Sequence, residues 1–208
     1  MKTIRWLRRW ILRWEVIVGF TVLLLLAWFG TRAFLFDYFR VPTASMHPTI
    51  PAGSLILIDK RGFGNYGLFG YLPFQTRGAR AVDRADIIVS QQEGTRAHYV
   101  QRVIDLPGDR ITYQDKRQRI NDRSIPLEFG TTDQRLQYAT ENIDGHAVTI
   151  AFMSDRYSRD TDVVVPAGQL FVLGDNRDNA RDSRFIGFVP KASIIGRVSK
   201  VVQPPRDP

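Results

Sequence analysis

The chain has 208 residues, of which 44% are hydrophobic and 24% charged, so we expect one core domain of about 150 residues and an additional segment. It contains no cysteine, which excludes thiol nucleophiles, disulfide bonds and thiolate metal sites, and its three histidines form no HExxH zinc-protease motif. The net charge of +8 could suit nucleic acid, but five excess cations lie in the first fourteen residues and only +3 remains for the other 194. We therefore expect no nucleic-acid partner, no metal and no cofactor.

An uncharged apolar run follows these cations, at residues 16–30. Ten of its residues are Val, Ile, Leu or Phe, which favour transfer into a bilayer by about 3–6 kcal/mol. The run is shorter than the ~20 residues of a typical span. Trp and aliphatic residues on both sides can extend it if Arg13, Glu15 and Arg32 reach for the interface.

Two other interpretations of this run are a buried core helix and a cleaved secretory signal. A core helix is not normally apolar on every side behind five cations, and the residues after the run form a poor small-x-small cleavage site. We therefore predict a retained anchor helix at residues 15–36. By the positive-inside rule, residues 1–14 form a cytoplasmic tail and residues 37–208 a periplasmic or extracytoplasmic domain. The predicted location is the inner (plasma) membrane, crossed once, with the lipid bilayer as a partner.

Beyond the anchor, short apolar runs alternate with turns rich in Gly, Pro, Asn and Asp, and no long helical period occurs. The runs expected to be strands are 55–58, 85–89, 98–104, 110–113, 147–152, 162–165, 169–173 and 193–202. Strands at this spacing predict a mainly β, antiparallel sandwich or barrel-like domain. Residues 127–145 are polar and turn-rich, and we expect a surface excursion there.

One segment, GFGNYGLFGYLPF at residues 62–74, interleaves five aromatic residues with glycines. One interpretation is a hairpin whose aromatic side chains face the core. The other is an exposed apolar patch that enters the lipid interface beside the anchor. The sequence leaves both open.

Three further segments carry candidate chemistry. The first, FRVPTASMHPTIPAGSLILIDK (39–60), holds Ser45 in a proline-rich loop, where a serine is most often only a turn hydroxyl. The second, HYVQRVIDLPGDRITY (98–113), is typical of two strands around a Pro-Gly turn. The third, LGDNRDNARDSRFIGFVP (173–190), contains three Asp and three Arg. It is either a solvated loop or a buried ion-pair scaffold that holds geometry.

In this order the three segments resemble the signature motifs of type I signal peptidases, the membrane-anchored Ser/Lys-dyad proteases that remove signal peptides from exported proteins. The match runs over residues 32–202, most of the chain after the apolar run. The resemblance implies an antiparallel β-rich catalytic domain behind one transmembrane helix. It also implies that signal peptides of exported precursors bind as an added strand and are cleaved after a small-x-small motif.

The resemblance implies a role for each matching residue. Ser45 would be the nucleophile, and its backbone N–H would form the oxyanion hole with the Thr43 hydroxyl. The residues that would line shallow pockets for small substrate side chains are Phe39, Val41, Pro42, Met46, Ile50, Tyr99 and Val100. Two ion pairs would brace the site, Arg102 with Asp175 and Asp182 with Arg184.

Two positions depart from the family pattern. Gln101 stands where the family has its lysine general base, and Ala180 stands where it has a serine that hydrogen-bonds that lysine. A serine hydroxyl is a weak nucleophile until a neighbouring base takes its proton, and a carboxamide cannot hold that proton. Loss of a general base costs about 10²–10⁴ in rate. The two changes are consistent with each other, because the family's serine at position 180 has no lysine to hydrogen-bond once Gln101 replaces that lysine.

Three other groups are candidates for a substitute base. His98 lies three residues from Gln101, so a regular strand points it to the opposite face unless a bulge intervenes. His47 lies two residues from Ser45, and Lys60 ends the strand after the serine loop. Two hypotheses follow. Either Ser45 cleaves exported precursors with a substitute base, or the chain is a catalytically inactive paralogue that binds signal peptides or another partner.

Overall fold

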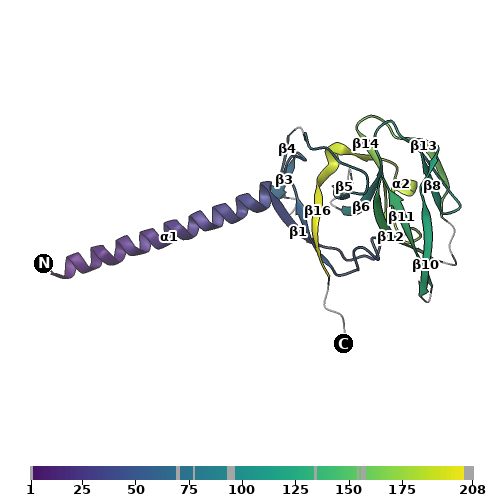
Figure 1. Ribbon diagram of the computed structural model, residues 1–208. Helices are drawn as coiled ribbons and strands as arrows, with labels where there is room; N and C mark the ends of the chain where they lie inside the picture. The colour runs from purple at the N-terminus through teal and green to yellow at the C-terminus, as the bar shows by residue number, and fades with distance from the viewer. Residues whose placement is uncertain are drawn as a thin grey trace.

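The computed structural model describes residues 2–68, 71–76, 78–92, 97–133, 135–153, 155 and 158–203. Helix α1 (Lys2–Phe34) projects as a straight rod from a β-rich domain (Figure 1). Its segment Arg13–Phe34 is long and apolar enough to cross a membrane, and only 11% of the apolar stretch is buried. This exposure distinguishes α1 from the core helix of a globular domain. The helix begins within the predicted tail and ends two residues before the predicted boundary.

The domain is built from short strands. In the described residues these are β1 (Phe36–Arg40), β2 (Leu55–Asp59), β3 (Asn65–Leu68), β4 (Tyr71–Gln75), β5 (Ile87–Gln91), β6 (His98–Asp105), β7 (Arg110–Gln114), β8 (Arg117–Ile120), β9 (Arg123–Ser124), β10 (Leu127–Asp133), β11 (Leu136–Ile143), β12 (His146–Met153), β13 (Thr161–Val164), β14 (Gln169–Leu173), β15 (Val189–Pro190) and β16 (Ile194–Val202). Two short helical turns, α2 (Ser183–Ile186) and η1 (Lys191–Ser193), lie near the C-terminus.

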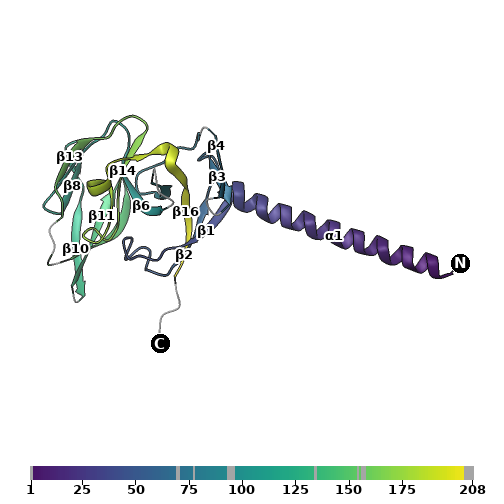
Figure 2. The same ribbon diagram turned by 180° about the vertical axis from the view of Figure 1, so that it is seen from behind.

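The strands form antiparallel sheets. One sheet has the order β1-β2-β16-β5-β6-β14-β15, and the others are β10-β11-β12, β13-β7-β8-β9 and β3-β4. The first sheet lies toward α1, and the second and third lie on the far side of the domain, as both views show (Figures 1 and 2). Each of the eight runs expected to be strands corresponds to a strand of the structure. The prediction of an antiparallel, mainly β domain behind one apolar helix is confirmed.

The expectation for residues 127–145 is wrong in that this segment forms strands β10 and β11, although β10 does lie exposed at the surface. Every second residue at the end of β11 is buried, namely Ala139, Glu141 and Ile143. Buried glutamate interrupts the apolar alternation by which a half-buried strand is recognised. A paired buried charge therefore made a strand resemble a polar loop.

The Gly-aromatic segment forms the β3–β4 hairpin beside the end of α1. Phe63 is buried in a core cluster, whereas Phe74 is 57% exposed. Tyr66 contacts Phe34 of the helix, with ring centroids 5.4 Å apart. The described aromatic side chains are thus divided between the core and the surface, while residues 69 and 70 lie outside the described part. Lipid contact by this hairpin stays a prediction.

Candidate active site

The loop that carries Ser45 joins β1 to β2 and is fixed at both ends. Backbone hydrogen bonds close it, from Val41 N to Ser54 O at 2.9 Å and from Gly53 N to Val41 O at 2.7 Å. Met46 and Ile50 are fully buried in the cluster below the loop. Ser45, which precedes Met46, is thereby held half-buried at the domain surface.

The segment after β14 holds the other side of this loop. The Asn176 backbone N–H donates to the carbonyl of Ser45 at 3.0 Å, and its side-chain amide donates to the carbonyl of Ala44 at 3.1 Å. A Cβ atom on Gly174 would lie 2.6 Å from the Ser45 carbonyl oxygen and 2.3 Å from the Ala180 Cβ. Only glycine permits this close approach. Gly174 and Asn176 belong to the third motif, yet the sequence did not single them out.

A groove of about 520 Å³ runs past Ser45. The predicted site residues that line it are Phe39, Val41, Pro42, Thr43, Ser45, Tyr99, Val100, Gln101 and Ala180. The structure brings these residues together from three distant segments. Met46 and Ile50 do not line the groove but lie beneath it, with no exposed surface.

Two hydroxyl groups meet at the groove. The Oγ atoms of Thr43 and Ser45 lie 3.2 Å apart, and either can donate the hydrogen bond. In the described part of the chain, Thr43 is the hydrogen-bond partner of the Ser45 side chain. A hydroxyl does not remove a proton from serine near neutral pH, so this contact orients Ser45 without activating it.

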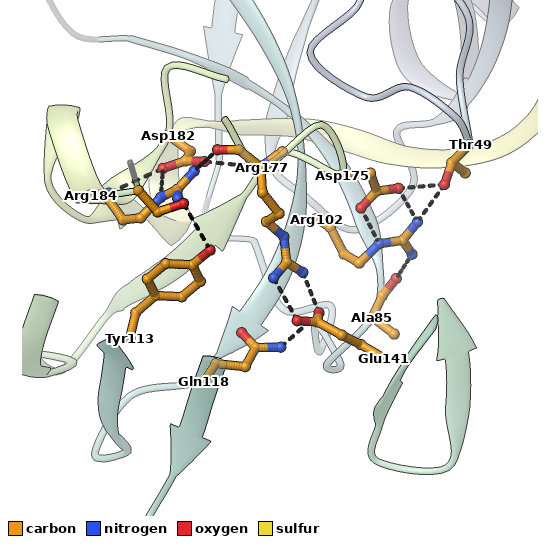
Figure 3. Close-up of polar contacts among 12 residues, drawn as sticks. Thr49, Ala85, Arg102, Tyr113, Gln118, Glu141, Asp175, Arg177, Asp182 and Arg184 are labelled. Atoms are coloured by element: carbon orange, nitrogen blue, oxygen red, sulfur yellow. Dashed lines mark hydrogen bonds and ion pairs between the residues drawn. The ribbon is translucent and has the colours of Figure 1, made fainter. Parts of the chain in front are cut away.

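Both predicted ion pairs are present and buried (Figure 3). Arg102 donates to the two carboxylate oxygens of Asp175 at 2.8 and 2.6 Å, and also to the carbonyl of Ala85 at 2.7 Å. Thr49 donates to the same carboxylate from the serine loop. This pair therefore joins strand β6, the segment after β14 and the loop of Ser45.

The second ion pair, Asp182 with Arg184, holds the segment after β14 beside the Ser45 loop. Arg184 donates to Asp182 at 2.9 and 2.7 Å, and Gly174 N donates to Asp182 at 3.2 Å. Asp182 also accepts from the backbone N–H of Arg184 and so caps α2. The carboxylate of Asp182 thus holds Gly174 close to Ser45.

A third buried pair was not predicted. Arg177 and Glu141 have 0% and 1% of their side chains exposed and form two hydrogen bonds, one of them 2.7 Å long (Figure 3). Gln118 donates to the same carboxylate at 2.9 Å. Glu141 lies in the segment expected to be a surface loop, so no sequence signal connected it with Arg177. The pair ties the three-stranded sheet to the third motif.

Gln101 occupies the position of the family's lysine. It is 4% exposed, and its Nε2 donates to the carbonyl of Arg181 at 3.0 Å. Its Oε1 accepts no hydrogen bond from the residues that the structure describes. The amide therefore connects β6 to the segment that follows Ala180 and is not hydrogen-bonded to Ser45.

The three candidate substitute bases lie in different places. The His47 ring hydrogen-bonds the Tyr138 hydroxyl at 3.0 Å. The Lys60 ammonium donates to the Arg32 carbonyl at 3.2 Å, and Lys60 does not line the groove. His98 does line it, with its ring 5.1 Å from that of Phe39. Within the described residues, none of the three hydrogen-bonds Ser45.

Strand β6 is regular around His98. It pairs with β5 without a register shift from His98 to Arg102, so no bulge turns His98 toward the side of Gln101. Burial lowers the pKa of His98, while Asp37 opposes this effect and Lys60 adds to it. The imidazole is therefore neutral at neutral pH. Burial also lowers the pKa of Lys60.

No group of three His, Asp or Glu residues in the described segments is placed to hold a metal ion. The site instead consists of hydroxyl groups, an amide and apolar walls, fixed by buried ion pairs. Together with the apolar helix, this defines a protein whose described part has one candidate membrane span and a serine in a surface groove.

Comparison with known proteins identifies the family. Residues 11–203 match the family described as signal peptidase, peptidase S26, and the chain belongs to this family. Signal peptidase I of Rickettsia conorii is 36% identical over 188 residues, covering 80% of this chain and 71% of the relative. Signal peptidase I of Pseudomonas fluorescens is 32% identical over 195 residues, covering 82% and 66%. A crystal structure of a signal peptidase I from Enterococcus faecalis is similar with a TM-score of 0.41 and 26% identity, over 58% of this chain and 98% of that one.

Proposed function

We propose that this chain binds signal peptides of exported proteins in the Ser45 groove and does not cleave them efficiently. The observation that carries the proposal is the surroundings of Ser45. Its hydroxyl is paired with Thr43, while Gln101, at the position of the general base, is hydrogen-bonded to Arg181. A peptide carbonyl can reach Ser45 in such a site, but among the described residues no base is hydrogen-bonded to Ser45 to accept its proton.

The groove supports binding of an extended peptide. Strand β1 is the edge strand of its sheet, where β2 is its one partner among the described strands, and its residues Phe39 and Arg40 line the groove. Free backbone groups of an edge strand can pair with an added strand. Val41 and Val100 give the groove apolar walls that suit small side chains at alternate positions of that strand.

The proposed setting is the outer face of the inner (plasma) membrane. The five cations in residues 1–14 favour a cytoplasmic N-terminus by the positive-inside rule. Helix α1 then places the groove on the side where signal peptides emerge. The same charges account for most of the basic excess without a nucleic-acid partner.

A binding experiment tests the proposal. The full chain in lipid nanodiscs is titrated with a fluorescent signal peptide that contains a small-x-small motif, and the peptide mass is measured after prolonged incubation. We expect saturable binding and intact peptide. Val100→Arg, which places a charge in the apolar wall, should abolish binding, whereas the exposed Thr131→Arg should leave it unchanged. Absence of binding by the parent chain would refute the proposal.

One observation favours a second candidate function, which is slow hydrolysis with His98 as the base. His98 lines the same groove, and its lowered pKa keeps it neutral and able to accept a proton. This candidate requires that bound peptide bring His98 and Ser45 into contact. Product formation that both His98→Phe and Ser45→Ala abolish would establish it in place of the first.

A further inference from the structure

The junction between α1 and the domain contains no flexible linker. One residue, Leu35, separates the end of α1 from the start of β1. Lys60 hydrogen-bonds one carbonyl of the last helical turn, where carbonyls lack partners within the helix, and also the carbonyl of the linking residue Leu35. Its backbone N–H donates to Leu35 at 2.8 Å, and its ammonium donates to Arg32 at 3.2 Å. Lys60 directly follows β2, so the helix end is attached to the domain.

A buried ion pair closes the same junction. The Arg32 Nε donates to Asp37 at 2.9 Å, and another Arg32 nitrogen donates to the Tyr38 hydroxyl at 3.2 Å. The guanidinium also lies over the Tyr38 ring, 4.2 Å from its centre. Arg32, Asp37 and Lys60 are 6%, 3% and 2% exposed. Separating such buried charges leaves each without compensation, which is strongly unfavourable.

The hairpin supports the helix from another side. Tyr66 of β3 contacts Phe34, the last residue of α1, with ring centroids 5.4 Å apart. Helix α1 is therefore held by the segment after β2, by β1 and by β3. A swing of the helix in any direction breaks at least one of these contacts.

The groove begins directly beyond the junction. Strand β1 has five residues, which span about 17 Å when extended, and its Phe39 already lines the groove. Ser45 follows on a loop anchored in the core. The helix, β1 and one wall of the groove are thus one continuous piece of chain.

We propose that Arg32, Asp37 and Lys60 form a rigid joint that fixes the height and tilt of the Ser45 groove relative to the membrane anchor. The groove then receives a peptide segment at one distance from the bilayer. A peptide segment that directly follows an apolar helix inserted in the bilayer is itself held at a fixed distance from the bilayer. The nature of the ligand rests on the proposed function, whereas the rigidity of the joint does not.

Distance measurements by electron paramagnetic resonance test the joint. The chain has no cysteine, so Leu24→Cys in α1 and Thr131→Cys in β10 introduce one label pair across the joint. In nanodiscs the parent should give one narrow distance distribution. The double variant Asp37→Asn with Lys60→Met should widen it about twofold, as expected when a fixed junction becomes a hinge.

Two controls separate a loosened joint from an unfolded domain. A label pair within the domain, Thr131→Cys with Lys191→Cys, should keep its distribution in the double variant. Asp162→Asn, which breaks the exposed pair with Arg110, should leave both label pairs unchanged. A broad distribution across the joint in the parent chain, or no widening in the double variant, would overturn the proposal.

A binding comparison then links the joint to the proposed function. The double variant should bind a membrane-inserted signal peptide about tenfold more weakly than the parent, while binding of a short soluble peptide is unchanged. Equal loss for both peptides would contradict the role in positioning. If the parent binds neither peptide, the proposed function fails, whereas the distance distributions still decide whether the joint is rigid.

Discussion

Asp105 ends strand β6 with no exposed surface, and replacing it with asparagine should stabilise the protein most at alkaline pH. Neither of its carboxylate oxygens accepts a hydrogen bond from the described residues. Arg84 lies 4.0 Å away, but it also pairs with Asp109 and Asp144. Burial, and then the charge of Asp109, raise the pKa of Asp105 from 3.8 to about 7, against the opposing effect of Arg84.

The size and sign of the effect follow from this pKa. A carboxyl whose pKa is raised on folding destabilises the folded state when it ionises, so the cost is small near pH 4 and complete above pH 7. The difference between 3.8 and about 7 corresponds to about 4 kcal/mol at high pH. Between pH 5 and pH 8, the cost grows by about 3 kcal/mol. An asparagine at this position does not ionise, so its variant does not carry this pH-dependent free-energy cost.

Denaturant unfolding of the full chain in detergent micelles measures the effect. The free energy of unfolding of Asp105→Asn, relative to the parent, should rise by about 3 kcal/mol from pH 5 to pH 8. The matched variant Asp162→Asn, at an exposed aspartate, should show no such rise. A constant difference between Asp105→Asn and the parent across this range would mean that ionisation of Asp105 does not destabilise the folded state.

Three further predictions concern the scaffold and the membrane face. Glu141→Gln leaves Arg177 buried without a countercharge, and it should lower the free energy of unfolding by about 3–5 kcal/mol in the same assay; a loss no larger than that of Asp162→Asn would contradict this. Gly174→Ala places a Cβ 2.6 Å from the Ser45 carbonyl, so it should weaken peptide binding at least about tenfold while the far-ultraviolet circular dichroism stays unchanged; unchanged affinity would count against the geometry. A fluorescent label at the exposed position Phe74→Cys should be quenched more in brominated than in unbrominated lipids if the hairpin contacts the bilayer. Equal fluorescence in the two lipids would exclude that contact.

The sequence predicted the strands and the site motifs well because their signals are local. Runs of apolar residues between turn residues located the eight expected strands. Ser45 and both bracing ion pairs were instead implied by the resemblance of the three motifs to the family, since Arg102 and Asp175 lie 73 positions apart and no local signal joins them. Spacing alone could not show that Met46 and Ile50 lie below the groove, because a loop's burial depends on the sheet beneath it.

What the sequence missed depends on contacts between distant segments. Glu141 read as a polar loop residue because its partner Arg177 lies 36 positions away. The attachment of Lys60 to the end of α1 was equally hidden, since Lys60 was considered only as a base for Ser45. In both cases a buried charge is explained by a partner that only the tertiary fold supplies.

Whether Ser45 has a general base is decided by end-point digestion of an exported precursor. The parent, Ser45→Ala and the double variant Gln101→Lys with Ala180→Ser are incubated with the precursor in detergent, and the products are read by mass spectrometry. We expect no more product from the parent than from Ser45→Ala, and a gain of about 10²–10⁴ in rate for the double variant. Correctly trimmed product from the parent that disappears in Ser45→Ala would contradict this expectation.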